Sequence, residues 1–134
     1  MTIKGVVTLS GSTRFKKQFE AVNLILSSKG YLVLLPASYG RTIENHDVQK
    51  WINSHLQELE ELHRDKILRS HVVFIIDVDG YMGDSTKAEM EYTLKNFKKI
   101  NLLSRELKED KEPSPTDLFN DVDRLIYRKY VENE

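Results

Sequence analysis

The stretch Val72-Val73-Phe74-Ile75-Ile76, followed directly by Asp77-Val78-Asp79-Gly80, decides the fold that this sequence predicts. Consecutive β-branched and aromatic residues are typical of a strand that is buried on both faces, as in a parallel sheet covered by helices. The acidic, glycine-containing residues that follow predict a loop at the carboxyl end of this strand, which is where ligands bind in open parallel sheets. The same stretch therefore predicts both a fold and the place of a site.

Three shorter apolar runs predict further strands, at residues 5–9, 31–35 and 100–103. Between and after them, apolar residues at helical spacing predict helices over about residues 15–29, 48–68, 85–98 and 116–130. The zone 48–68 is long enough for one helix or two, and residues 37–45 before it are expected to form a loop. This α/β alternation predicts a three-layer sandwich with a mostly parallel, doubly wound, Rossmann-like sheet of about four to five strands.

Each predicted helix carries an apolar stripe. In the zone 48–68 the stripe consists of Trp51, Ile52, Leu56, Leu59, Leu62 and Ile67. In the next helix it consists of Met90, Leu94 and Phe97, and in the last helix, which Thr116 is expected to cap, of Leu118, Val122, Leu125 and Ile126. Residues 104–115 are expected to form an exposed connector between the core, about residues 3–103, and the C-terminal helical segment, residues 116–134.

The composition indicates one ordinary domain that spans residues 1–134. The chain has 134 residues, of which 40% are hydrophobic, and a formal net charge of −1. This near balance gives no electrostatic reason to expect nucleic acid polymers or acidic membranes as partners. The absence of cysteine excludes disulfides, thiolate catalysis and zinc–thiolate sites. No apolar run reaches the roughly 20 residues that span a bilayer, and Met1-Thr2-Ile3-Lys4 does not start a signal peptide, so we expect a cytoplasmic protein.

The first segment that could carry chemistry is Ser10-Gly11-Ser12-Thr13-Arg14, which joins the first strand to the first helix. Backbone N–H groups, hydroxyls and a guanidinium at such a junction could hold an anion such as phosphate. The segment is not a Walker loop and lacks the three glycines of dinucleotide-binding folds. An ordinary capped turn between strand and helix explains the same residues equally well.

The second segment is His63-Arg64-Asp65-Lys66-Ile67, which comes shortly before the buried strand. A solvated helix face with ion pairs is the simpler interpretation of this run. His63 is nevertheless a candidate for chemistry, because an imidazole near a helix end changes its charge at physiological pH in response to nearby acids.

The third segment is the acidic loop and the start of the helix after it. Thr86-Lys87-Ala88-Glu89 matches a capping box, with Thr86 as the N-cap and Glu89 reaching back to it. Helical geometry places Glu89 and Glu91 on either side of the apolar stripe, so either carboxylate could face a pocket. Four further polar residues favour a site at this strand end, namely Asp77, Asp79, Asp84 and Ser85, and Gly80 lies among them.

With these residues the chain resembles the nucleoside 2-deoxyribosyltransferases and the related deoxynucleoside 5′-monophosphate N-glycosidases, over Ile3 to about Leu103. The resemblance rests on Gly11-Ser12-Thr13-Arg14-Phe15, on Gly80-Tyr81-Met82-Gly83-Asp84-Ser85-Thr86 and on the Glu that follows. It implies that Glu89 is the nucleophile that attacks the anomeric carbon. It also implies that residues 10–14, together with the acidic loop, bind the sugar or its 5′-phosphate, and that the chain forms a homodimer or larger homo-oligomer.

Two residues depart from the family pattern: Glu91 stands where glycine is usual, and His63 stands where an Asp is common. The proton for the departing base would then come from Asp77, Asp79 or His63. We therefore expect cleavage or transfer at the N-glycosidic bond of a nucleoside or nucleotide, without a cofactor. The alternative is a non-catalytic nucleotide-binding or sensor module with the same fold. The reaction requires no metal, although Asp77, Asp79 and Asp84 could bind Mg²⁺ if the loop closed around it.

Overall fold

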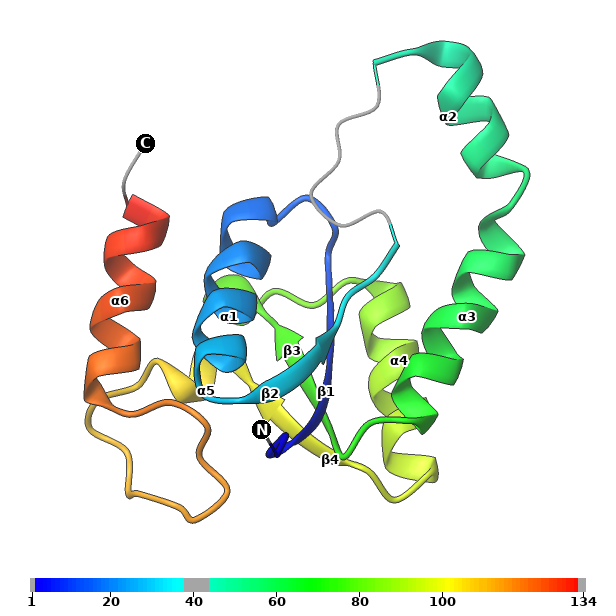
Figure 1. Cartoon of the computed structure of the whole chain (residues 1–134). Coiled ribbons are helices and arrows are strands. Elements are labelled where there is room, and N and C mark those ends of the chain that lie inside the picture. The colour runs from blue at the N-terminus through cyan, green and yellow to red at the C-terminus, as the bar shows by residue number, and fades with distance from the viewer. Residues whose placement is uncertain (1, 38–43, 133–134) are drawn as a thin grey trace.

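The computed structural model describes residues 2–37 and 44–132, and within them four parallel strands form one sheet (Figure 1). The strands are β1 (Gly5–Gly11), β2 (Tyr31–Leu34), β3 (Val72–Ile76) and β4 (Lys99–Leu102), in the spatial order β2-β1-β3-β4. The chain thus moves outward from β1 to one edge and then from β3 to the other. The carboxyl ends of β1 and β3 meet where this direction reverses, which is the usual ligand position in doubly wound sheets.

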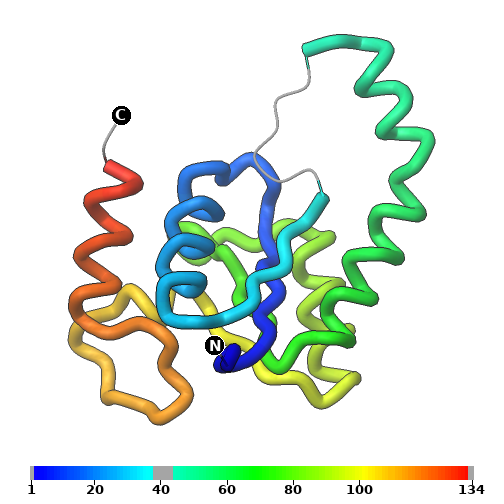
Figure 2. The backbone as a smooth tube through the Cα atoms, viewed as in Figure 1, coloured from blue at the N-terminus to red at the C-terminus, as the bar shows by residue number. Residues whose placement is uncertain are grey.

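Helices cover both faces of the sheet (Figures 1 and 2). Helix α1 (Lys16–Ser28) and helix α6 (Asp121–Glu132) pack together on one face. Helix α3 (Leu56–Leu68) and helix α4 (Asp84–Lys95) pack together on the other. The fold class expected from the sequence, an α/β three-layer sandwich with a Rossmann-like parallel sheet, is confirmed.

The alternation of side chains along the strands divides the core into two layers. Leu9 and Phe74 face α1 and α6, whereas Val73 and Ile75 face α3 and α4, and all four are fully buried. Strand β3 is therefore apolar on both faces, as its uninterrupted hydrophobic sequence predicted.

The zone 48–68 forms two helices, since α2 (His46–Asn53) ends at Ser54 and α3 begins after His55. Asn45 caps α2 by accepting hydrogen bonds from the backbone N–H groups of Asp47 and Val48. Helix α2 extends away from the sheet (Figure 1). Of the loop expected at residues 37–45, residues 38–43 lie outside the described part of the chain.

The segment expected as an exposed connector contains a short helix, α5 (Leu103–Glu106), and the side chain of Glu106 is buried. Its carboxylate accepts hydrogen bonds from the backbone N–H groups of Leu118 and Phe119, which holds this stretch out of a helix. The last helix consequently begins at Asp121, and Thr116 is not its cap. Asn120 and Asp123 instead bond reciprocally, each side chain accepting from the other's backbone N–H at 2.9 Å.

The apolar stripes expected on α4 and α6 are largely wrong. In α4 the buried positions are Thr86 and Thr93, whereas Leu94 is 56% and Phe97, just beyond the helix, 96% exposed. In α6 the buried residues are Arg124 and Tyr127, and three of the expected apolar residues are exposed: Val122, Leu125 and Ile126. In α6, Arg124 donates to the backbone carbonyl of Glu106, and this contact turns Arg124 inward in place of the expected apolar residues. In α4, Met90 alone of the three expected residues packs against the core.

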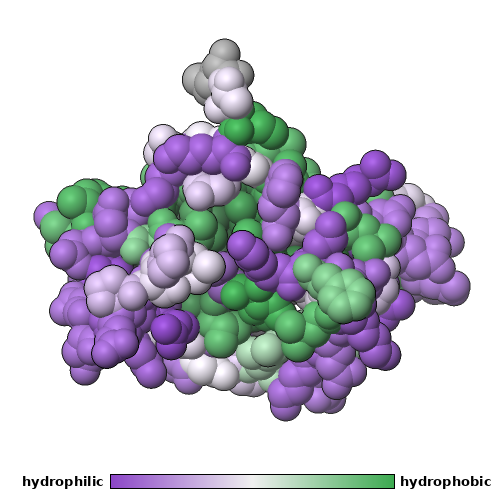
Figure 3. All heavy atoms as spheres, turned by 90° about the horizontal axis from the view of Figure 1, so that it is seen from below, coloured by the Kyte–Doolittle hydropathy of each residue, from purple (hydrophilic) through white to green (hydrophobic). Residues whose placement is uncertain are grey.

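Figure 3 views the molecule from the amino ends of the strands and shows apolar atoms in the middle of this face, bordered mainly by hydrophilic ones. The cavity described next lies at the opposite end of the sheet. Among the helices in the described ranges, none combines the length and the apolar character needed to cross a bilayer.

Candidate functional site

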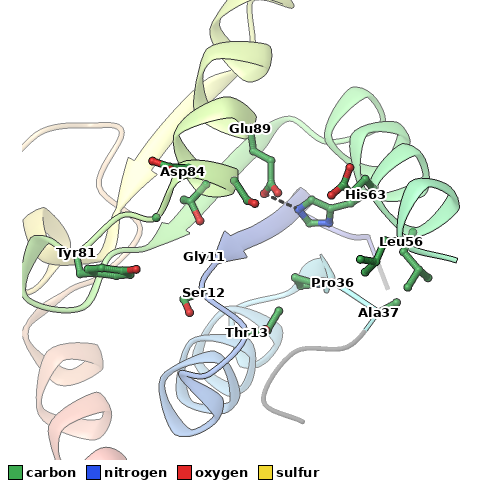
Figure 4. Close-up of a pocket in the computed structure, with 15 residues that line it drawn as sticks. Gly11, Ser12, Thr13, Pro36, Ala37, Leu56, His63, Tyr81, Asp84 and Glu89 are labelled. Carbon is green, nitrogen blue, oxygen red and sulfur yellow. Dashed lines mark ion pairs between the residues drawn. The ribbon is translucent and has the colours of Figure 1, made fainter. Parts of the chain in front are cut away.

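A cavity of about 380 Å³ lies at the carboxyl ends of the central strands, between α3 and the start of α4 (Figure 4). Four parts of the chain line it: the β1–α1 loop, the residues after β2, helix α3, and the stretch from Tyr81 into α4. Figure 4 shows Tyr81 on one side of the cavity and Leu56 on the other, with Glu89 and His63 pointing toward one another between them. The topology therefore brings segments that are far apart in the sequence to one place.

The centre of the site is a contact between His63, Glu89 and Ser10. Nε2 of His63 lies 3.1 Å from Oε1 of Glu89 and 3.0 Å from Oγ of Ser10. Because a carboxylate only accepts hydrogen bonds, the contact with Glu89 needs the hydrogen on Nε2. His63 is only 8% exposed and Ser10 is fully buried, so packing fixes these two side chains, whereas Glu89 borders the cavity.

This arrangement is not a serine-hydrolase triad, although it contains a serine, a histidine and a glutamate. In such a triad the two imidazole nitrogens contact the nucleophile and the acid separately. Here both contacts use Nε2, and Nδ1 of His63 is buried without a hydrogen-bond partner in the described residues. Glu89, which lines the cavity, is therefore the better candidate for reaction with a ligand, and His63 is the group that holds its carboxylate in position.

The capping box expected at the start of α4 is wrong. The N-cap is Gly83, Thr86 lies buried inside the helix, and the Glu89 side chain turns to His63 instead of reaching back. Glu91, the other carboxylate that could have faced a pocket, is exposed and does not line the cavity. Glu91 therefore does not change the cavity directly, although it stands at the position where the resembling family has glycine.

The end of β1 and the β1–α1 loop reach the cavity through Gly11, Ser12 and Thr13, whereas Arg14 does not line it. The Arg14 guanidinium lies over two aromatic rings, 4.8 Å from the Phe15 centroid and 4.5 Å from the Tyr81 centroid. Ser12 and Thr13 thus offer hydroxyls to a ligand. Arg14, the cation that the sequence offered as an anion ligand in this loop, is held outside the cavity lining by cation–π contacts.

Three residues of the acidic loop lie away from the cavity lining. Asp77 is 3% exposed, and its carboxylate accepts hydrogen bonds from the backbone N–H and the hydroxyl of Ser104, at 2.8 and 2.6 Å. Asp79 (φ 52°) and Gly80 (φ 80°) form an exposed turn beside α6. Burial, and then the negative charge of Asp79, raises the pKa of Tyr127 in α6 to about 12. Of the three proton donors considered, His63 alone lines the cavity.

Asp84 and Ser85, also expected from the sequence, do line the cavity. Asp77, Asp79 and Asp84 do not form a metal site, since within the described ranges no three His, Cys, Asp or Glu side chains come together as metal ligands would. The cavity also contains a residue that the sequence reasoning missed, Glu60. Its spacing of three from His63 on the same helix was the signal that could have found it.

A scan against protein-family models found no match. Searches of curated proteins and of solved structures found none either. The function is therefore argued from the geometry of the cavity and from the motifs in the sequence.

Proposed function

We propose that this protein cleaves or transfers at the N-glycosidic bond of a nucleoside or nucleotide, with Glu89 as the nucleophile. The observation that carries the proposal is the Glu89 carboxylate in the cavity, held 3.1 Å from the buried His63 at the carboxyl end of the sheet. A carboxylate in this position can stabilise or trap the positive charge that develops on a sugar as its base departs.

The reaction proceeds in two balanced steps. In the first, Glu89 bonds to the anomeric carbon while the bond to the base breaks, its electron pair leaves with the base, and His63 in its imidazolium form donates a proton to that base. In the second, water attacks the same carbon and releases Glu89, and the proton lost by the water returns to His63. If another base takes the sugar in place of water, the same site performs a transfer.

The polar groups around Glu89 suit a sugar. Ser12 and Thr13 lie on one side of the cavity and Ser85 on the side of α4. Their hydroxyls can donate to and accept from the hydroxyls of a sugar ring, which fixes its orientation relative to the carboxylate.

The test is chromatography of the common nucleosides, deoxynucleosides and their 5′-monophosphates after incubation with the purified protein, with and without an acceptor base. We expect free base from at least one of them and a loss of about a thousandfold or more in the Glu89→Gln variant, as for removal of a nucleophile. Glu91→Gln is the matched control, because Glu91 lies on the same helix but outside the cavity. Base release that survives in a folded Glu89→Gln variant contradicts the assignment.

The contact between His63 and Glu89 also supports the second candidate, a nucleotide-binding module without catalysis. The imidazolium form of His63, which the first step of the reaction needs, also stabilises the negative charge of the Glu89 carboxylate and so lowers its reactivity toward carbon. Titration calorimetry with the same panel separates the two functions. Binding of an intact ligand with no release of base, in the wild type, supports the binding module.

A further inference from the structure

We propose that Glu60 is a specificity-determining residue, which makes the cavity select nucleosides and disfavour their 5′-phosphates. The inference rests on the proposed function and goes beyond it by naming the substrate class. Glu60 projects from α3 and lines both the main cavity and a smaller one, of about 210 Å³, that adjoins Glu89.

The charges of the cavity lining disfavour a phosphate. Within the described part of the chain, the lining contains the three carboxylates of Glu60, Asp84 and Glu89 and no lysine or arginine, so with the one imidazolium of His63 it still carries two more negative than positive groups. A phosphate monoester bears close to two negative charges at neutral pH and is repelled by each of these groups. An uncharged sugar is not repelled by these carboxylates.

The positions of Arg14 and Arg64 also disfavour a phosphate in the main cavity. Arg14, which the sequence offered as the phosphate ligand, is stacked on Phe15 and Tyr81 outside the cavity lining. Arg64 lines only the smaller cavity, and its guanidinium lies over the Tyr92 ring at 5.5 Å. A phosphate in the main cavity would therefore meet carboxylates before it met either of these two guanidinium groups.

The hydrogen-bonding capacity of the carboxylates in the lining also favours a nucleoside over its 5′-phosphate. Ionised carboxylates only accept hydrogen bonds, so a ligand beside Glu60 and Asp84 must supply donors. Sugar hydroxyls and the amino groups of bases are donors, whereas phosphate oxygens are acceptors. A divalent cation that bridged a carboxylate and the phosphate would reverse this preference, so the comparison below is made in the presence of EDTA.

The experiment compares kcat/KM for each deoxynucleoside with that for its 5′-monophosphate, in a buffer with EDTA, for the wild type, Glu60→Gln and Glu61→Gln. We expect the wild type to prefer the nucleoside. Glu60→Gln should narrow that preference by about fivefold, through a lower KM for the monophosphate and an unchanged kcat. Glu61→Gln should leave it unchanged, since Glu61 is the next residue of the same helix but does not line the cavity.

A wild type that prefers the monophosphate overturns the inference, and so does an equal effect of the two variants. Glu60 is exposed, so both variants should fold, which circular dichroism checks. If no base is released from any compound, the proposed function fails, and calorimetry with deoxyadenosine and its 5′-monophosphate still decides the inference. The inference is supported if the nucleoside binds more tightly than the monophosphate and if Glu60→Gln, but not Glu61→Gln, narrows this difference. Tighter binding of the monophosphate, or no binding of either compound, overturns it.

Discussion

Gly11 ends β1 directly beside β3, and its position depends on the absence of a side chain. A Cβ atom there would lie 2.9 Å from the backbone oxygen of Ile76 and 3.0 Å from the Ile76 Cβ, with φ at +152°. The neighbouring atoms belong to the central strand and cannot move aside. The close approach of the two strands at this point also sets the floor of the cavity, which Gly11 lines.

We therefore expect Gly11→Ala to lower the free energy of unfolding by about 2 to 3 kcal/mol, measured by urea denaturation. Gly83→Ala is the control, since a Cβ at Gly83 would be 3.4 Å from the Tyr81 hydroxyl, an ordinary contact. Gly83→Ala should lower the free energy of unfolding by about 1 kcal/mol or less, because alanine is a poorer N-cap than glycine. Equal losses in the two variants would show that the contact with Ile76 is not the cause.

At the scale of the element, the end of α4 combines a common motif with an unusual residue. Backbone N–H groups of Phe97 and Lys98 donate to the carbonyls of Leu94 and Thr93, at 3.1 and 3.2 Å, which is the Schellman pattern. Phe97 has φ 58°, a conformation normally taken by glycine, and its side chain is 96% exposed. The Cβ of Phe97 thus adds backbone strain, and its aromatic ring does not contribute to the core.

Phe97→Gly should raise the free energy of unfolding by about 1 kcal/mol, because it relieves the strain and removes no buried contact. Phe97→Ala removes the same ring but keeps the Cβ, so it should give no comparable gain. Thermal and urea denaturation of the two variants provide the measurement. A larger gain from alanine than from glycine would mean that the exposed ring, and not the backbone, is the destabilising feature.

At the scale of the whole molecule, half of the stripe expected on α2 and α3 lies at the surface formed by residues 2–37 and 44–132. Three of its six residues are exposed by 47 to 63%, namely Trp51, Leu62 and Leu56, which also borders the cavity, and the neighbouring Val48 is exposed by 46%. A helix as short as α2 gains little stability unless its apolar side is covered. We propose that a second copy of the chain covers this side, which agrees with the homo-oligomer implied by the sequence resemblance.

Light scattering should accordingly give a mass above the 15.6 kDa of one chain. Trp51→Glu should raise the dissociation constant of the oligomer by about 30-fold or more, as for a buried tryptophan at an interface. Leu125→Glu is the control, because Leu125 is 51% exposed on α6, at the other face of the sheet. Dissociation by Leu125→Glu alone would move the interface to α6, and a monomeric wild type would contradict the proposal.

The sequence by itself determined the four strands, the helices between them and the parallel sheet, because these follow from local periodicity. It also named most of the polar residues at the cavity, since the carboxyl ends of parallel strands collect them. It also named Arg14, Asp77, Asp79 and Gly80, which do not line the cavity. Its errors about secondary structure concern helices: the stripes of α4 and α6, the capping box at Thr86, and the cap at Thr116. In each case the helix was placed correctly or nearly so, but its rotation or its first residue was not.

Only the tertiary structure decided which side chains meet. Ser10, His63 and Glu89 come from β1, α3 and α4, and their contact depends on how those elements pack. The same packing places Glu89 in the cavity lining and Glu91 outside it. It also places the Asp77 carboxylate against Ser104 and the Arg14 guanidinium over the Tyr81 ring. Periodicity fixes which elements form, whereas the rotation of each helix depends on polar and apolar contacts between residues far apart in the chain, which no local pattern contains.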